Sequence, residues 1–327
     1  MAFISVIIVN YNSGNRLHRC LDALEAQSFR DFETIIADNG STDGSEATGE
    51  NRNVSTRLLK LGENLGFAAA NNRAAEIAKG EWLVFLNPDA YARSDWLSAF
   101  SSASKQYPEI DAFGATQLDA ENPDTLDGAG DVYHALGLTY RAKSGHPANE
   151  TPPDHDCFSA CAAAMMIRKS RFDELNGFDE RFFCYGEDVD LGFRLRLAGR
   201  KIMQLQNAVV LHEGSGVTGR FSEFTVYHGN RNRIWLTHKN MPTAIYWWLG
   251  PAQLIANLAL MTRYARIGCA RAYCRALIDG YGGLASLHAS RRSIQQHRKT
   301  SASEIAGAMT WSLGKIFRRE GRHINAS

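Results

Sequence analysis

The amino-acid sequence predicts an α/β fold with a mostly parallel sheet and a C-terminal helical extension. Apolar, β-branched runs alternate with segments of helical spacing over the first ninety residues. Polar side chains follow the ends of several predicted strands. The last ninety residues differ, because they are basic and aromatic and lack this alternation. Strands that alternate with helices are typical of parallel sheets whose faces are covered by helices.

The first predicted strand, Phe3–Val9, is a mostly β-branched run, which favours burial on both faces. It is too short to span a membrane, and no basic region precedes it, so we expect no signal peptide. Further strands are expected at 32–37, 58–61 and 81–86, and helices at 17–24 and 68–79.

Three polar side chains, Asn10, Asp38 and Asp89, lie just past predicted strand ends. Ligands of open α/β sheets bind at the carboxyl ends of the strands. We therefore expect these three residues on one rim of the sheet.

The central part of the chain is less regular. Residues 115–155 predict loops with short strands, and Cys157–Ile167 is apolar enough for either a buried strand or a buried helix. A four-residue apolar spacing indicates that Asp188 begins a helix, and Val209–Leu211 predicts a strand that ends at His212.

From residue 240 onward there are twelve Lys/Arg and three Asp/Glu, a net charge of +9, whereas residues 1–239 carry −8. Such a tail favours an anionic partner, either nucleic acid or anionic lipid. No nucleic-acid recognition motif is present, so we expect no nucleic-acid partner. Ala244–Met261 is nearly free of charge and predicts either helices in a membrane interface or a helical subdomain that packs on the core or in a dimer.

The six cysteines form no CxxC pair and no zinc spacing, which favours reduced thiols in a cytoplasmic protein.

Three positions combine chemistry with a structural alternative. Asp89 is a candidate metal ligand or the cap of a helix over 90–100. Glu187 and Asp188 open a helix, so Asp188 is a candidate general base or a capping charge. His212 is a candidate metal ligand or an ordinary structural histidine.

Taken in order, the motifs resemble those of the family 2 glycosyltransferases, over about residues 3–240. The matching segments are Val6-Ile-Ile-Val-Asn-Tyr-Asn12, Ala37-Asp-Asn-Gly-Ser-Thr-Asp-Gly-Ser45, Asn64-Leu-Gly-Phe-Ala-Ala-Ala-Asn-Asn72, Gly80-Glu-Trp-Leu-Val-Phe-Leu-Asn-Pro-Asp89, Gly177-Phe-Asp-Glu-Arg-Phe-Phe183, Glu187-Asp-Val-Asp-Leu-Gly-Phe-Arg194, His212 and Asn230-Arg-Asn232.

The resemblance implies the GT-A (Rossmann-like) fold and a role for each matched residue. Asp188 corresponds to the catalytic base of an inverting, metal-dependent enzyme, with Asp89 and His212 as ligands of Mg²⁺ or Mn²⁺. Glu187 and Arg231 are implied to contact the acceptor. The implied donor-binding residues are Asn10, Tyr11, Asp38, Asp43, Asn64, Asn72 and Asn87.

Two positions depart from the family pattern. Asn87 replaces the first Asp of the metal motif, which weakens the expected metal affinity. Cys161-Ala162 stands where relatives often carry Ser-Gly, which affects the expected acceptor pocket.

The form of the motifs most resembles bacterial rhamnosyltransferases that use dTDP-L-rhamnose. The resemblance implies a glycan or polyprenyl-diphosphate-linked acceptor in cell-envelope synthesis, a peripheral position at the inner face of the plasma membrane through residues 241–327, and possible oligomers. It also implies a nucleotide-sugar-binding half, 1–115, and an acceptor-binding and catalytic half, 116–240. The alternatives are a UDP-sugar donor (galactofuranose, glucose or N-acetylglucosamine), a nucleotidyltransferase, and a non-catalytic nucleotide-sugar-binding protein.

Overall fold

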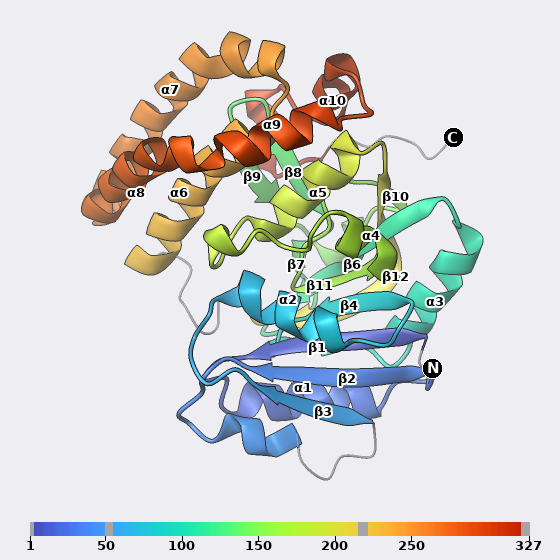
Figure 1. Ribbon diagram of the computed structural model, residues 1–327. Coiled ribbons are helices and arrows are strands. Elements are labelled where there is room, and N and C mark those ends of the chain that lie inside the picture. The colour runs from blue at the N-terminus through green and yellow to red at the C-terminus, as the bar shows by residue number, and fades with distance from the viewer. Residues whose placement is uncertain (1–2, 50–54, 215–221, 322–327) are drawn as a thin grey trace.

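The computed structural model describes residues 3–49, 55–214 and 222–321. Its centre is a twisted sheet with the strand order β10-β12-β6-β11-β4-β1-β2-β3, to which β5 and β7 add at β12 and β6 (Figure 1). The strands run as follows: β1 Ile4–Asn10, β2 Phe32–Asp38, β3 Thr56–Lys60, β4 Trp82–Leu86, β5 Ala90–Ala92, β6 Ile110–Asp119, β7 Leu126–Gly128, β10 His155–Asp156, β11 Ala164–Arg168 and β12 Lys201–His212. A separate hairpin joins β8 (Asp131–His134) to β9 (Leu138–Arg141).

Strands β1 to β4 form a parallel half-sheet in which Asn10 pairs with Asp38 at the final register position. The antiparallel strand β11 lies between β4 and β6, and β12 then pairs parallel with β6. The mixed α/β architecture expected from the sequence is therefore confirmed. Residues of the first hundred and of the second hundred contribute to one continuous sheet.

The helices are α1 Asn15–Glu25, α2 Phe67–Ile77, α3 Trp96–Gln106, α4 Lys169–Glu174, α5 Glu187–Leu197, α6 Glu223–Asn240, α7 Thr243–Arg266, α8 Ala270–Gly282, α9 His288–Gln296, α10 Ala302–Ala308 and α11 Leu313–Arg318. The short 3₁₀ turns are η1 Ser45–Gly49, η2 Ala148–Glu150, η3 Glu180–Phe182 and η4 Gly283–Leu287.

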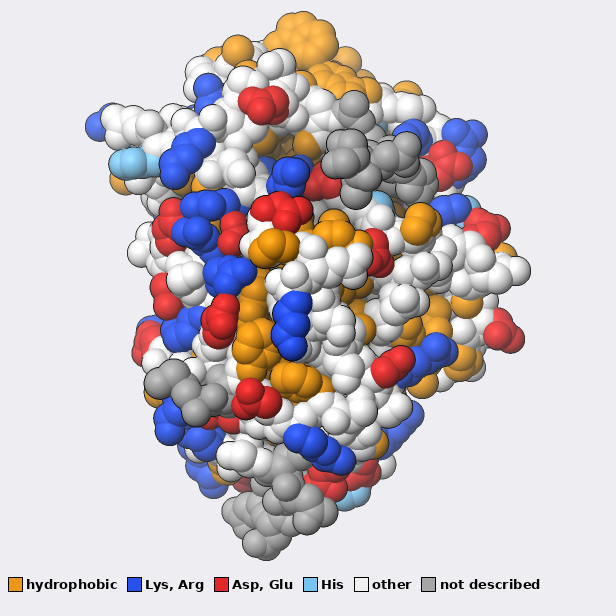
Figure 2. Space-filling view, turned by 90° about the vertical axis from the view of Figure 1, so that its right-hand side faces the viewer, with side chains coloured by type: hydrophobic (Ala, Val, Ile, Leu, Met, Phe, Trp, Pro, Cys, Tyr) orange, Lys and Arg blue, Asp and Glu red, His pale blue; other side chains and the backbone are white. Residues whose placement is uncertain are grey.

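The C-terminal extension, α7 to α11, packs on the core and also exposes apolar side chains. Ile245 and Leu249 of α7 are buried beside Phe193 of α5. Trp247 and Trp248 lie between these two residues in the sequence, and they remain about 70% exposed. Figure 2 shows hydrophobic side chains at the top of the molecule, over these C-terminal helices. One face of the segment therefore packs on the core, as one of the two sequence alternatives expected, and another face stays exposed.

Helix α7 continues through Pro251. Proline removes one backbone donor, but a helix held on one side by packing tolerates that loss. Within the described residues, no helix combines the length and apolar character that crossing a membrane requires.

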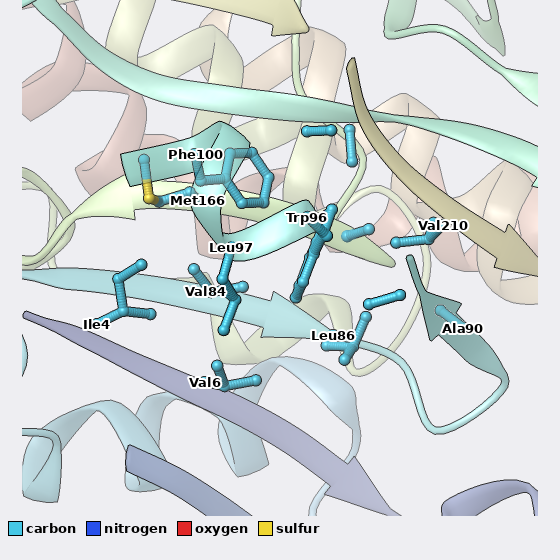
Figure 3. Packing of buried hydrophobic residues seen from close by; sticks show 14 of the residues in the cluster. Ile4, Val6, Val84, Leu86, Ala90, Trp96, Leu97, Phe100, Met166 and Val210 are labelled. Atoms are coloured by element: carbon cyan, nitrogen blue, oxygen red, sulfur yellow. The ribbon is translucent and has the colours of Figure 1, made fainter. Parts of the chain in front are cut away.

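Alternating side chains of the buried strands build two cores. Ile4 and Val6 of β1 face helices α1 and α3, and Figure 3 shows Trp96, Leu97 and Phe100 of α3 packed over them and over β4. Ile7 and Val9 point the other way, against the alanine-rich face of α2 and against α4 and α5. The sheet is therefore covered on both faces, which explains why its first strand is apolar throughout.

One local expectation was wrong. The helix expected over 90–100 is displaced, because Ala90–Ala92 forms β5 against β12 and α3 begins only at Trp96. Asp89 therefore caps no helix. The apolar segment 157–167, expected as either a buried strand or a buried helix, is a buried strand from Ala164 onward, where β11 begins.

A buried charge cluster joins α5 to α6. The carboxylate of Asp190, fully buried, accepts hydrogen bonds from Lys239 Nζ at 2.8 Å, Arg194 Nε at 2.8 Å and Asn240 Nδ2 at 2.7 Å. Lys239 also contacts Asp179 at 2.6 Å. Burial opposes ionisation of Asp190, but the two cations hold its pKa below the ordinary value. The cluster fixes the start of α5 against α6.

We predict that Lys239→Met destabilises the fold strongly. The change leaves two buried carboxylates short of one cation, which costs about 3–5 kcal/mol in comparable sites. The measurement is the free energy of unfolding in urea. Lys169→Met is the matched control, because Lys169 pairs with the exposed Asp173 at 3.0 Å, and its loss should cost about 0.5 kcal/mol or less. Equal effects of the two substitutions would contradict the prediction.

Candidate active site

Residues from four strand ends meet at the carboxyl edge of the parallel half-sheet. Asn10 and Asp38 end β1 and β2, Asp89 follows β4, and His212 ends β12. β5 pairs antiparallel with β12 so that Ala90 lies opposite His212. This pairing brings Asp89 and His212 together although 123 residues separate them in the chain.

The Asp38 side of the rim is a hydrogen-bonded loop. Asn10 is fully buried, and its amide nitrogen donates to Asp38 at 3.0 Å, Ser41 at 3.0 Å and Ser45 at 2.9 Å. Asp43 accepts from the backbone N–H of Gly14 at 2.9 Å. The structure therefore places Asn10 behind Asp38.

Tyr11 is more exposed than its neighbours Asn10 and Asp38, with 39% of its surface accessible.

Asn64 and Asn72, two further asparagines of the donor motifs, hold loops in place. Asn64 accepts from the side chain of Asn39 at 2.9 Å and from the backbone of Gly66 at 3.0 Å. Asn72 exchanges hydrogen bonds with the backbone N–H and carbonyl of Phe178, at 2.9 and 2.8 Å. Asn72 thereby ties α2 to the Gly177-Phe-Asp motif on the other half of the chain.

Asp89 and His212 form a buried pair. Asp89 Oδ1 lies 3.5 Å from His212 Nε2, and the two residues are 5% and 2% exposed. His212 Nδ1 lies 2.7 Å from Asp127 Oδ2, which fixes the ring orientation and favours a proton on Nδ1. Arg141 contacts the same carboxylate of Asp127.

Two atoms of this part of the site that could bind a metal make no hydrogen bond in the described part of the chain. Among the described residues, His212 Nε2 and Asn87 Oδ1 are buried and make no hydrogen bond. With Asp89 they offer one imidazole nitrogen and two oxygens, a set that suits Mn²⁺ or Mg²⁺. The residues present therefore fit a divalent cation.

Asp188 lies at the start of α5 and is held by two backbone donors. Its Oδ2 accepts from Ala162 N–H at 3.1 Å and its Oδ1 from Val189 N–H at 2.8 Å. Burial raises the pKa of this carboxyl, against the lowering effect of the two N–H groups. Asp188 lines a cavity of about 280 Å³ between the β8–β9 hairpin, the start of α5 and α6.

Asp131, Cys161 and Asp188 form a tight group whose potential ligand atoms lie within 4.8 Å of one another. Burial and the nearby charge of Asp188 raise the pKa of Asp131 well above its usual range, and burial raises the pKa of Cys161 to about 12. Burial therefore favours the protonated forms of Asp131 and Cys161, whereas two backbone N–H groups favour ionisation of Asp188. This arrangement favours Asp188 as the group that ionises, rather than a second cation site.

The structure separates the two residues implied to contact the acceptor. Glu187 is buried, and its Oε2 has no hydrogen-bond partner among the described residues. Arg231 donates to the carbonyl of Phe182 at 3.1 Å and stacks on Trp235 with its guanidinium 4.3 Å from the ring centroid. Arg233, two residues further along α6, lines the cavity beside Asp188.

Several residues of this site escaped the sequence reasoning, namely Asp127, Asp131, Arg141, Asp190 and Arg233. The first three come from segment 115–155, where no periodicity marked them. Asp190 stands inside the Glu187-Asp188 motif, two positions after Asp188, so its position was the one available signal.

The fold is that of the GT-A glycosyltransferases. TarS from S. aureus, residues 1–349 with UDP-GlcNAc, superposes with a TM-score of 0.58 at 16% identity, over 95% of this chain and 93% of that one. The Pyrobaculum calidifontis mannosyltransferase PcManGT, with GDP-Man and Mn²⁺, gives 0.56 at 19% identity, over 90% and 84%.

The family follows from the sequence comparison. Residues 5–175 match glycosyl transferase family 2, and residues 151–213 match the N-terminal domain of galactosyltransferase. The chain belongs to glycosyl transferase family 2 and is a glycosyltransferase, as the motifs had suggested.

Two curated relatives illustrate the range of similarity. The N-acetylglucosaminyl-diphospho-decaprenol L-rhamnosyltransferase of Mycobacterium tuberculosis is 29% identical over 79% of this chain and 91% of its own length. The O-antigen biosynthesis protein RfbC of Myxococcus xanthus is 32% identical over 65% of this chain but only 17% of that longer protein.

We predict that Glu187→Gln changes how stability depends on pH. Burial, and the charge of Asp188, raise the pKa of Glu187 well above its ordinary value, so the folded state holds this proton more tightly than the unfolded state. In the wild type this contribution is fully present below the unfolded pKa, about 4.3, and is lost as the pH rises through the folded pKa.

The glutamine variant lacks that titration. The free energy of unfolding in urea, measured from pH 4 to 8, should therefore increase for the variant relative to the wild type as the pH rises. A constant difference between the two proteins would contradict a raised Glu187 pKa.

Proposed function

We propose that this enzyme transfers L-rhamnose from dTDP-L-rhamnose to a hydroxyl of a lipid-linked sugar diphosphate, with inversion at the anomeric carbon. The observation that carries the proposal is the similarity to the mycobacterial rhamnosyltransferase, which extends over nearly the full length of that relative. The acceptor class is taken from the relative's printed activity, on a diphospho-decaprenol-linked N-acetylglucosamine.

Asp188 is the proposed general base. Its carboxylate is fixed by Ala162 and Val189 and lines an open cavity, so a lone pair remains available for an acceptor hydroxyl. As the acceptor oxygen attacks the anomeric carbon, its proton passes to Asp188 and the bond from that carbon to the diphosphate oxygen breaks. A single displacement from the face opposite the leaving group inverts the configuration.

Asp89 and His212 are the proposed ligands of a divalent cation, and Asn87, two residues before Asp89, is a candidate third ligand through its buried Oδ1, which makes no hydrogen bond to any residue that the structure describes. When bound, such a cation supplies positive charge that neutralises the departing diphosphate. Asp127 holds the imidazole by its Nδ1 and leaves Nε2 free to bind the metal.

We assign the nucleotide to the Asp38 rim, with Tyr11 and Asp43 beside it and Asn10, Asn64 and Asn72 as residues that hold the loops in place. The UDP-GlcNAc of the TarS structure makes a UDP-sugar the second candidate donor. Since that likeness is at 16% identity, the dTDP-sugar remains our first choice.

We predict that Asp188→Asn abolishes transfer, with a loss of about 10²–10⁴-fold or more in kcat, because the amide cannot accept the acceptor proton. Donor binding should survive, since Asp188 lies away from the Asp38 rim. Thermal shift with dTDP-L-rhamnose, UDP-glucose, UDP-galactofuranose and UDP-GlcNAc, with and without Mn²⁺, measures that binding.

Asp173→Asn, at an exposed position of α4, is the control and should transfer at the wild-type rate. Substantial transfer by Asp188→Asn would remove Asp188 from the role of base. A stabilising shift by a UDP-sugar alone would replace the dTDP-sugar as donor.

We also propose that the extension rests on the inner face of the plasma membrane. The exposed residues Trp247, Trp248, Leu254, Ile255 and Leu258 recur on one stripe of α7. Arg263 and Arg266 end the same helix and are exposed. An apolar stripe with adjoining arginines is typical of helices that lie in an anionic lipid interface.

We predict that the double change Trp247→Ser and Trp248→Ser reduces flotation of the protein with vesicles that contain phosphatidylglycerol. Vesicles of phosphatidylcholine alone are the control and should bind the wild type more weakly. Flotation unchanged by the double substitution would contradict the proposal. A wild-type dimer that the substitution dissociates would instead assign the stripe to a second copy of the chain.

A further inference from the structure

The cavity beside Asp188 contains a cation that has no carboxylate partner among the described residues. Arg233 donates from its Nη2 to Asn257 Oδ1 at 2.5 Å, and its Nε is buried without a hydrogen-bond partner. No Asp or Glu of the described ranges lies within ion-pair distance of this guanidinium. A partly buried charge with unsatisfied donors is costly unless a ligand pairs with it.

The guanidinium is held in place by the extension. Asn257 of α7, itself 3% exposed, receives the hydrogen bond from Arg233 and donates to Tyr281 at 2.8 Å. Tyr273 donates to the carbonyl of Asn257 at 3.0 Å. These contacts orient the Arg233 guanidinium without neutralising its charge, which leaves it available to bind an anion.

One face of α6 forms a wall of the cavity. Thr225, Gly229, Arg233 and Leu236 recur at helical spacing and all line it. A side chain added at Gly229 would meet nothing within 4 Å, so this position opens the wall to a ligand. The volume, about 280 Å³, is at the lower end of the range of small-molecule sites.

Two carboxyl groups line the same cavity as Arg233. Asp188, the proposed base, lines the cavity together with Asp131, whose pKa is raised well above its usual range by burial. An acceptor sugar whose hydroxyl meets Asp188 would therefore present its anomeric substituent elsewhere in the cavity. A guanidinium fork matches phosphate oxygens in charge and geometry.

We infer that Arg233 is a specificity-determining residue that binds the diphosphate of the acceptor. The inference rests on the proposed function, since it assumes that the cavity beside Asp188 receives the acceptor. Arg141 lines the cavity too, but it pairs with Asp127 and is therefore less available to a ligand.

The test measures equilibrium binding of farnesyl-diphospho-N-acetylglucosamine, a soluble probe, to the full chain with dTDP and Mn²⁺ saturating the donor side. Arg233→Gln should bind the probe about tenfold or more weakly, and Arg233→Lys should recover part of the loss. Arg30→Gln, an exposed position in the loop before β2, is the matched control and should bind like the wild type.

Octyl N-acetylglucosaminide, which carries the same sugar without phosphate, separates the charge from the sugar. Its affinity should not change in Arg233→Gln. Equal losses for both probes, or no loss for either, would overturn the inference. Gly229→Leu, which fills the open wall, provides a second variant, and it should weaken binding of both probes.

The two proposals fail in different ways. A wild type that binds the diphosphate probe through Arg233 but transfers no sugar to it contradicts the proposed function and supports the anion site. A wild type that transfers sugar to both probes with equal KM contradicts the anion site and supports the transferase.

Discussion

The buried contact between Asp190 and Lys239 is the constraint on which the catalytic half depends. It fixes the first turn of α5, and Asp188 stands in that turn two residues earlier. Arg194, which shares the same carboxylate, also donates to the carbonyl of Gly177 at 2.8 Å and so holds the preceding motif loop. Asp190, the last acidic residue of the Glu-Asp-Val-Asp motif, is therefore structural, and its contacts hold the turn that carries Asp188.

The buried carboxyl groups of the site differ in the direction of their pKa shifts. Cations and a histidine surround Asp89, whereas Asp131, Glu187 and Asp188 lie where burial favours their protonated forms. Burial also opposes ionisation of Asp89, but His212, a backbone hydrogen bond and the charge of Arg141 together hold the pKa of Asp89 below its ordinary value. One edge of the sheet thus provides both a carboxyl of lowered pKa and a carboxyl of raised pKa, which suit metal binding and proton transfer respectively.

Local pattern predicted the parallel strands and α2 well, because those segments are apolar on both faces or strictly periodic. It also predicted the rim of Asn10, Asp38 and Asp89. It failed at β5, since Ala90–Ala92 is a strand only by virtue of β12, which lies 109 residues further on. Asp127 and Arg233 escaped for the same reason: their partners, His212 and Asn257, are set by tertiary contacts that no local pattern records.

The position of β11 has a consequence for how this chain can evolve and be engineered. Because β11 inserts between β4 and β6, and β12 delivers His212 to Asp89, the first 115 residues cannot complete either the sheet or the Asp89–His212 pair alone. The first 115 residues are therefore not a transplantable module here. During synthesis the pair forms only after the chain has reached residue 212, so both parts of the sheet mature as one folding unit.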